Sequence, residues 1–421
     1  MIVDRLQVAQ LRVFDSAEFG FTPGMNLLVG VNGVGKTTVL DALRILLSKT
    51  LPVITASRSR PDSFRMEDIR CRREGLKAQA LTAQIDLRLP GANYSYIVHK
   101  QPAPYVPDGG GMPRQQALET PDRDEWLPAK PSDAGQLRCA EQQPIAVFFS
   151  TRRSLVSDAA PSKGSAAGGQ AAAFADALTS RELRLAETAH WMKVQEELGE
   201  EDPAADQRHR ALVRAASRFL PECKNLRAEA DPKPRLLLEK KRVTLGVRQL
   251  SDGERGLLAI VLDLARRLSQ ANPGLSDPVR NGKGVVLIDE LDLHLHPKWQ
   301  RTIVEQLVRT FPNCQFIATT HSPQIVAAVE PEQVLLLTDK GVVRPDRTLG
   351  MDSNWILRHI MEADERPRHS AKAISRVEAL VRKGEFEKAR AEIESQRESG
   401  VDLPEWSVLE ARMARMEVLA E

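Results

Sequence analysis

Short apolar runs recur along the chain and predict the buried strands of a sheet. They lie at 25–29, 145–150, 284–288, 315–318 and 334–339. A strand with almost no polar positions is typical of a sheet covered on both faces, as parallel sheets flanked by helices are. Other stretches rich in β-forming side chains, at 2–21, 81–89 and 94–99, predict further strands, the last two in an antiparallel sheet.

Helical periodicity follows several of these runs. The segments after residues 37 and 250 carry apolar stripes, and 175–220 is helical and charged. The segment 235–247 predicts a hairpin. The last 60 or so residues carry three helical patterns, around 369–383, 385–398 and 404–419, separated by Gly384 and Gly400. The pattern therefore predicts an α/β core, interrupted by a mixed insertion and followed by a helical tail.

Composition and charge narrow the class of protein. Of 421 residues, 42% are hydrophobic and 28% charged, which excludes wholesale disorder. The net charge is +2, so charge alone does not predict a nucleic-acid binder. The four scattered cysteines form no CxxC pair and favour a reducing cytoplasm over a disulfide scaffold or zinc site. We find neither a membrane span nor a signal peptide in the sequence and expect a cytoplasmic protein.

The segment Gly30–Thr37 matches the phosphate-loop pattern G-x-x-x-x-G-K-[ST] at every fixed position. Glycines let backbone N–H groups surround phosphate oxygens, and the following helix directs its positive end at them. Lys36 would reach the β- and γ-phosphates, and the hydroxyl of Thr37 would bind Mg²⁺. The alternative is a plain Gly-rich turn. The predicted ATP contacts are Asn32, Gly33, Gly35, Lys36, Thr37 and Thr38.

Two carboxylates, Asp289 and Glu290, end the apolar strand at 284–288. The carboxyl end of a parallel strand would place them beside the phosphate loop. Asp289 is then the predicted Mg²⁺ ligand, and Glu290 the group that orients and deprotonates the attacking water. A solvated turn is the alternative for an isolated Asp-Glu pair.

Two weaker signals follow the same order along the chain. The segment Leu250-Ser251-Asp252-Gly253-Glu254 precedes an apolar helix and is either an anion site or a plain helix cap. His321 follows a buried strand and is either a catalytic or a structural histidine.

Taken together, the ordered motifs resemble the ABC-type ATPases of the RecF/SMC/OLD branch. The matching segments are the phosphate loop (30–37), the signature (250–254), Walker B (284–290), the D-loop (291–297) and the switch histidine (321). The resemblance implies that two protomers enclose two ATP molecules, that Ser251 and Gly253 contact the γ-phosphate of the partner's ATP, and that His321 senses the γ-phosphate in its own chain. No Q-loop glutamine is obvious, and the candidates are Asp68, Gln79 and Gln84.

A narrower resemblance rests on MEADERP (361–367), DLHLHPKWQR (292–301) and GEFEKARAEIES. These segments are similar to the compact AAA_21-type ATPases, which include the PtuA subunit of Septu and related retron anti-phage systems. This resemblance implies an antiviral ATPase that works as a homodimer or higher homo-oligomer with a separate HNH nuclease. His294 and His296, spaced like a metal pair, are then expected to pack in the D-loop instead.

The insertion and the tail argue against two related classes of protein, the coiled-coil SMC proteins and ATPases that carry their own nuclease domain. Heptads are not sustained between Thr37 and Ser251, which argues against an SMC coiled coil. The helical segment after His321 does not fit a Toprim nuclease, and no HNH pattern occurs, so we expect a chain that hydrolyses ATP and does not cut DNA. Two hypotheses stay open: a non-enzymatic ATP-binding scaffold, and a RecF-like ATPase that binds duplex DNA. The phosphate contacts for the latter would be Arg152, Arg153, Lys240, Lys241 and Arg242.

The predicted fold class is α/β: an ABC-type P-loop NTPase core with an antiparallel β subdomain, a mixed insertion and a helical tail. Residues 1–150 would form the first ATPase lobe, and 151–235 a mainly helical insertion. Residues 236–350 would form the second lobe, and 351–421 the tail.

Overall fold

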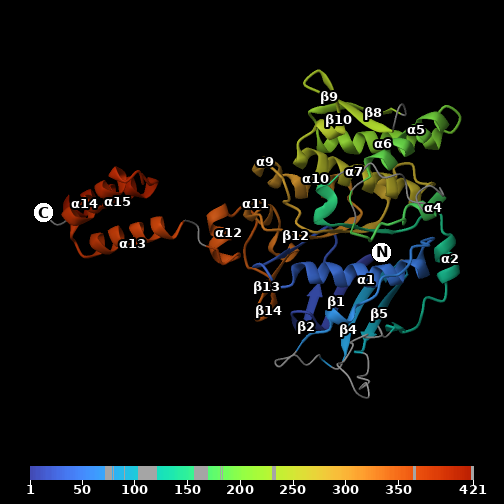
Figure 1. Ribbon diagram of the computed structural model, residues 1–421, viewed down its shortest axis with the longest axis horizontal. Coiled ribbons are helices and arrows are strands. Elements are labelled where there is room, and N and C mark those ends of the chain that lie inside the picture. The colour runs from blue at the N-terminus through green and yellow to red at the C-terminus, as the bar shows by residue number, and fades with distance from the viewer. Residues whose placement is uncertain are drawn as a thin grey trace, which may run out of the picture. The chain divides into compact units, whose positions relative to one another are not determined.

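The structure is a computed structural model that describes residues 1–71, 78, 80–89, 91–102, 121–155, 169–180, 182, 184–229, 234–363 and 367–418 (Figure 1). They form two compact units, Met1–Ile356 and Leu357–Glu421. The first unit contains every motif that the sequence singles out for nucleotide chemistry.

A six-stranded sheet forms the centre of the first unit. Its strand order is β14-β13-β3-β12-β11-β7, parallel except at β14. All residues of β3, β7, β11 and β12 are buried, which confirms the strands expected from the apolar runs. The strands are β3 (Met25–Val29), β7 (Ile145–Phe149), β11 (Gly284–Ile288), β12 (Cys314–Thr319), β13 (Val334–Thr338) and β14 (Gly341–Val343).

The second sheet is antiparallel, in the order β2-β1-β4-β5-β6. Burial alternates along β4, as expected of a strand with one covered face. The sequence pattern did not predict β6, whose residues are mostly exposed and polar. The strands are β1 (Ile2–Leu11), β2 (Phe14–Gly20), β4 (Leu81–Leu89), β5 (Ala92–Lys100) and β6 (Arg123–Leu127).

Helix α1 (Lys36–Ile54) contacts strands of both sheets and therefore lies between them (Figure 1). A buried ionic group ties it to the antiparallel sheet. Lys49 of α1 and Lys100 of β5 lie 3.1 and 3.3 Å from the two oxygens of Asp122, whose side chain is 2% exposed. The helix that carries the phosphate loop is thus attached on the side away from the parallel sheet.

Helix α7 (Asp252–Ala271) packs against β7 and also against the insertion helices. These are α4 (Gly169–Ala172), α5 (Leu185–Leu198) and α6 (Pro203–Phe219). A small sheet, β10-β9-β8, completes this part, and its hairpin confirms the one predicted at 235–247. Its strands are β8 (Cys223–Glu229), β9 (Arg235–Lys240) and β10 (Val243–Gly246).

Short helices connect these elements. They are η1 (Met66–Asp68), α2 (Ala134–Cys139), η2 (Thr151–Ser154), η3 (Val247–Gln249), α8 (Pro278–Asn281), α9 (Pro297–Gln300), α10 (Ile303–Thr310), α11 (Pro323–Val326), η4 (Pro331–Gln333) and α12 (Ser353–His359).

The second unit consists mainly of three helices, α13 (Arg368–Arg382), α14 (Phe386–Glu398) and α15 (Pro404–Val418), as the sequence predicts. Trp406, Val377 and Ile393 are fully buried in its own small core. Gly384 and Gly400 follow α13 and α14 with φ of 75° and 84°, the left-handed conformation that favours glycine after a helix. The tail therefore has the means to hold its three helices together without the first unit.

Candidate nucleotide-binding site

The phosphate loop connects β3 to α1, and the packing around it requires glycine. Gly30, Gly33 and Gly35 have φ of 152°, 83° and 106°, which L side chains rarely adopt. A Cβ on Gly30 would lie 2.5 Å from a backbone oxygen of Leu337, and one on Gly35 would lie 2.5 Å from the ring of Phe14. At Gly30 and Gly35 the neighbouring elements therefore approach too closely for any larger residue.

Lys36 and Thr37 lie at the start of α1, where this loop ends. The Lys36 Nζ donates hydrogen bonds to the carbonyl oxygens of Gly30 and Val31, at 2.7 and 3.0 Å. Burial lowers the pKa of Lys36, and the negative charge of Asp289 opposes this shift. Of the other predicted contacts, Asn32, Gly33 and Thr37 are exposed, and Thr38 is buried.

Asp289 and Glu290 lie at the carboxyl end of β11. The Thr37 hydroxyl lies 3.4 Å from Oδ1 of Asp289, and the Thr319 hydroxyl donates to the same oxygen at 2.8 Å. The backbone N–H of Glu290 donates to Thr319 Oγ1 at 2.7 Å. The structure thus brings Lys36, Thr37 and Asp289 to one edge of the sheet, from segments about 250 positions apart in sequence.

The oxygen donors at this edge fit Mg²⁺. A hydroxyl and a carboxylate are the hard ligands that Mg²⁺ prefers, and it takes its remaining ligands from water and phosphate oxygens. Thr37 and Asp289 supply such a pair. Over the described ranges, no group of three or more His, Cys, Asp or Glu side chains is placed to hold a metal.

His321 follows β12 and is exposed. Its backbone N–H donates to Oδ1 of Asp292 at 3.0 Å, and the Thr320 hydroxyl donates to the same oxygen at 2.6 Å. Asp292 lies two positions after Glu290 and is not among the predicted site residues. Asp292 therefore connects the segment of the switch histidine to the D-loop.

The two D-loop histidines have separate structural positions. His296 caps α9, where its Nδ1 accepts a hydrogen bond from the backbone N–H of Lys298. His294 is exposed, with a φ of 60°. Its carbonyl oxygen faces Gly253, where an added Cβ would come within 2.4 Å. The signature and the D-loop are therefore in close backbone contact.

Ser251 is the N-cap of α7 and forms a capping box with Glu254. Its Oγ lies 2.9 Å from Oε2 of Glu254, which also pairs with Lys240. This pairing accounts for Lys240 within the fold and argues against its predicted role in DNA contact. Ser251 and Asp252 are exposed, whereas Gly253 is buried against the D-loop.

The burial of the Arg153 side chain contradicts the prediction that this residue contacts DNA. It follows β7, which pairs with β11 in parallel register, and it is 4% exposed. Its guanidinium donates to the backbone oxygens of Asp289 and Glu290. Burial lowers the pKa of Arg153 to about 10, so it remains a cation at neutral pH. Arg152, by contrast, is exposed.

The Q-loop candidates have different surroundings. Asp68 is buried and accepts a hydrogen bond from Nε of Arg12 at 2.8 Å. Gln84 lies on β4 and donates to Asp86 at 2.9 Å. Gln79 lies outside the described residues. A segment that does contact Walker B is the one after β7, where Arg153 donates to the backbone oxygens of Asp289 and Glu290.

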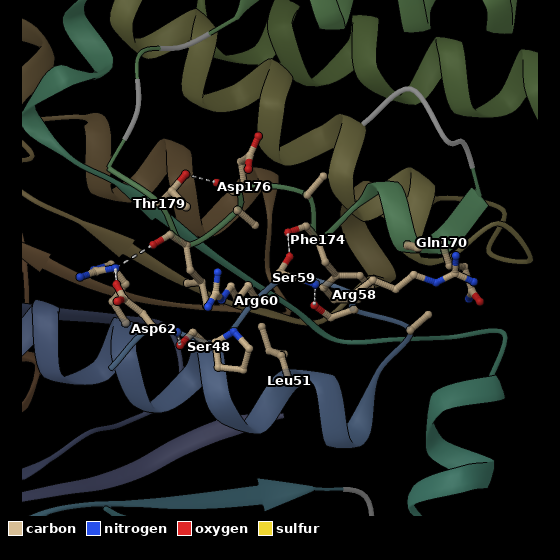
Figure 2. A pocket seen from close by; sticks show the side chains of 18 of the residues that line it. Ser48, Leu51, Arg58, Ser59, Arg60, Asp62, Gln170, Phe174, Asp176 and Thr179 are labelled. Atoms are coloured by element: carbon tan, nitrogen blue, oxygen red, sulfur yellow. Dashed lines mark hydrogen bonds and ion pairs between the residues drawn. The ribbon is translucent and has the colours of Figure 1, made fainter. Parts of the chain in front are cut away.

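A separate cavity of about 950 Å³ lies along the C-terminal half of α1, about three turns from Lys36 (Figure 2). Ser48 and Leu51 line it from α1, and Phe174 lines it from the opposite side. Arg58 and Arg60 also line it. This cavity is distinct from the phosphate loop.

Comparisons with known proteins agree with the motifs. A profile described as "AAA domain" (AAA_23) matches residues 5–158, and AAA_21, "AAA domain, putative AbiEii toxin, Type IV TA system", matches residues 177–327. The chain is 43% identical over 150 residues to the Retron Ec83 probable ATPase of Escherichia coli. It is 39% identical over 176 residues to the Retron Vc95 probable ATPase of Vibrio cholerae. These matches cover 35% and 40% of the chain.

Septu protein PtuA of Bacillus mycoides is 37% identical over 90 residues, 21% of this chain. The chain spans only 27%, 34% and 12% of the length of these three relatives. Among solved structures, SMC head domains and RecF align with 82% of the chain at 12–14% identity, with TM-scores of 0.43–0.48.

In its ordered motifs, and in the two AAA-domain profiles that each match part of the chain, the chain is similar to the ABC-type ATPases of the RecF/SMC/OLD branch. Within that branch it resembles the retron ATPases and PtuA. Both resemblances expected from the sequence are confirmed. The helices that the structure describes include none with the length and apolar character needed to cross a membrane.

Proposed function

We propose that the chain binds ATP with Mg²⁺ and hydrolyses it as a nucleotide-driven homodimer. The observation that carries this proposal is the gathering of Lys36, Thr37 and Asp289 at one sheet edge, with Glu290 next in sequence. Thr37 and Asp289 would hold Mg²⁺, which when bound offsets the negative charge of the phosphates. Lys36 adds a second positive charge from the start of α1.

In this proposal Glu290 acts as the general base. Its carboxylate accepts a proton from the water that attacks the γ-phosphate, and the Thr319 hydrogen bond holds its backbone in place. The exposed Ser251 would reach the nucleotide of the partner chain, with Gly253 behind it. His321 would act within its own chain, positioned through Asp292.

The test is Glu290→Gln, which keeps the side-chain shape and removes the base. We expect phosphate release to collapse, while ATP binding, followed with a fluorescent analogue, is retained. Ser251→Arg should keep ATP binding by the monomer and prevent ATP-dependent dimerisation in size-exclusion chromatography. Full turnover by the Glu290→Gln protein would contradict the assignment, and wild-type protein that binds ATP without releasing phosphate would favour the scaffold hypothesis.

We also propose that this ATPase serves anti-phage defence with a separate nuclease of HNH type. The retron and Septu relatives support this idea, and the helical tail is the candidate docking element, since it has its own core. Deletion of 369–421 should release the nuclease in a pull-down. Val408→Asp, at a position 68% exposed on α15, tests the same surface with the tail intact. Retained binding by both variants would place the interface elsewhere.

The RecF-like alternative rests on different residues. Lys241 and Arg242 form the exposed turn of the β9–β10 hairpin, with φ of 52° and 66°. If the chain binds duplex DNA there, replacing both by Ser should weaken a salt-dependent association and abolish any stimulation of phosphate release by DNA. Unchanged behaviour on random duplex would argue for the defence proposal.

A further inference from the structure

Arg153 is a buried cation beside Glu290 to which the proposed mechanism assigns no role. It belongs to η2, directly after β7, and is 4% exposed. Desolvating a guanidinium is costly unless hydrogen bonds compensate it. The hydrogen bonds of the Arg153 guanidinium therefore indicate its role.

The guanidinium spans two successive residues of Walker B. Nη1 donates to the carbonyl oxygen of Asp289, and Nη2 donates to that of Glu290. Nη1 also lies 3.1 Å from the carbonyl oxygen of Ser150, at the end of the neighbouring strand. The planar fork of arginine suits two adjacent acceptors, whereas the single ammonium of lysine does not.

The backbone that Arg153 holds has an unusual conformation. Glu290 has a φ of 50°, in the left-handed region that a residue other than glycine occupies only when its surroundings impose it. Thr319 fixes the N–H side of this residue at 2.7 Å, and Arg153 fixes the carbonyl side. The turn that sets the direction of the Glu290 side chain is thus held from both ends.

We propose that Arg153 is a positioning residue for the general base: it holds the left-handed turn at Glu290 and so directs the carboxylate at the attacking water. This inference rests on the proposed ATP hydrolysis. Arg153 also lines a small pocket with Asp252 and Gly256 of the first turns of α7 and with Leu293 of the D-loop. Arg153 therefore also borders the region that would face a partner chain.

The experiment compares Arg153→Ala and Arg153→Lys with Arg152→Ala, which removes the adjacent but exposed arginine. Each full-length protein is assayed for kcat and KM, and for ATP affinity with a fluorescent analogue. Since small displacements of a catalytic group cost about 100-fold in rate, we expect Arg153→Ala to lower kcat by about that factor. ATP affinity should stay within about 3-fold of wild type. Arg153→Lys should restore only part of kcat, and Arg152→Ala should match wild type.

A double variant separates positioning from a merely structural role. If Arg153 acts through Glu290, adding Arg153→Ala to Glu290→Gln should lower residual turnover no further. A further loss of turnover in the double variant would overturn the inference. So would an Arg153→Ala protein whose ATP affinity falls by as large a factor as its kcat, or one that keeps the full kcat of wild type. If Arg153→Ala does not fold, wild-type kcat in folded Arg153→Lys overturns it. Absence of turnover in the wild-type protein would instead refute the proposed function.

Discussion

The contact between the signature and the D-loop can be tested at Gly253. This residue lies in the first turn of α7, and a Cβ added there would be 2.4 Å from the backbone oxygen of His294. Ordinary contacts of a Cβ begin at 3.4 Å, so Gly253→Ala requires the helix or the D-loop to move by about 1 Å. Because the opposing atom belongs to the backbone, a change of rotamer cannot relieve the clash.

The size of the effect follows from two opposing terms. Overpacking a close contact costs about 1–3 kcal/mol. Replacing glycine by alanine within a helix gains up to about 1 kcal/mol, because alanine has the better helix propensity. Gly256, one turn further along α7, has no atom within 4 Å of its added Cβ and therefore shows the gain without the clash. The difference between the two alanine variants isolates the contact, at about 1–3 kcal/mol.

The assay is urea unfolding of wild type, Gly253→Ala and Gly256→Ala, with equal m-values required for the comparison. We expect the midpoint of Gly256→Ala at or above wild type, and that of Gly253→Ala below Gly256→Ala. Equal midpoints for the two variants would refute the reasoning, since the contact would then yield without cost. Loss of turnover in Gly253→Ala with unchanged stability would instead favour the predicted contact with the partner's ATP.

Three further predictions concern stability and thiol chemistry. Gly30→Ala would place a methyl group 2.5 Å from a backbone oxygen of β13 at a φ of 152°, so we expect loss of ATP binding and a lower thermal midpoint; wild-type binding would refute this. Asp122→Asn would remove the carboxylate that pairs with the buried Lys100 and the partly buried Lys49, and should cost about 3–5 kcal/mol in urea unfolding. An unchanged urea midpoint would contradict it. Burial raises the pKa of the Cys314 thiol to about 12, from an ordinary 9.0. At pH 8, alkylation of the folded protein should therefore modify only the exposed Cys71 and Cys139. Alkylation of the denatured protein should modify all four cysteines. Above pH 9 the unfolded thiol ionises first, so stability should fall as pH rises.

The elements that local patterns determine were predictable from the sequence. The phosphate loop needs only a strand, a glycine-rich turn and a helix, which are contiguous from 25 to 47. Each end of the three tail helices lies within one residue of its predicted position, because apolar spacing and the two glycines mark these helices. Walker B was similarly visible as an apolar strand that ends in Asp289 and Glu290.

The environment of Glu290 could not be predicted in this way. Arg153 lies 137 positions away in sequence, and its partners are backbone oxygens, which no residue type reveals. A short basic run such as Arg152-Arg153 therefore predicts a charged surface, and only the pairing of β7 with β11 shows which arginine is buried. The contact of Thr319 with Asp289 could not be predicted either, because it arises from the parallel register of β11 and β12.

The order of strands in the parallel sheet has a consequence for the predicted lobes. Strand β3, which leads into the phosphate loop, lies between β12 and β13. Both of these strands come from the second half of the chain. The neighbour of β7 is β11, which ends in the two Walker B carboxylates. Residues 1–150 by themselves would therefore leave the strands β3 and β7 without their hydrogen-bonding partners, a large cost for a buried backbone. The proposed lobes 1–150 and 236–350 share one sheet and must assemble together before Lys36 and Asp289 can meet.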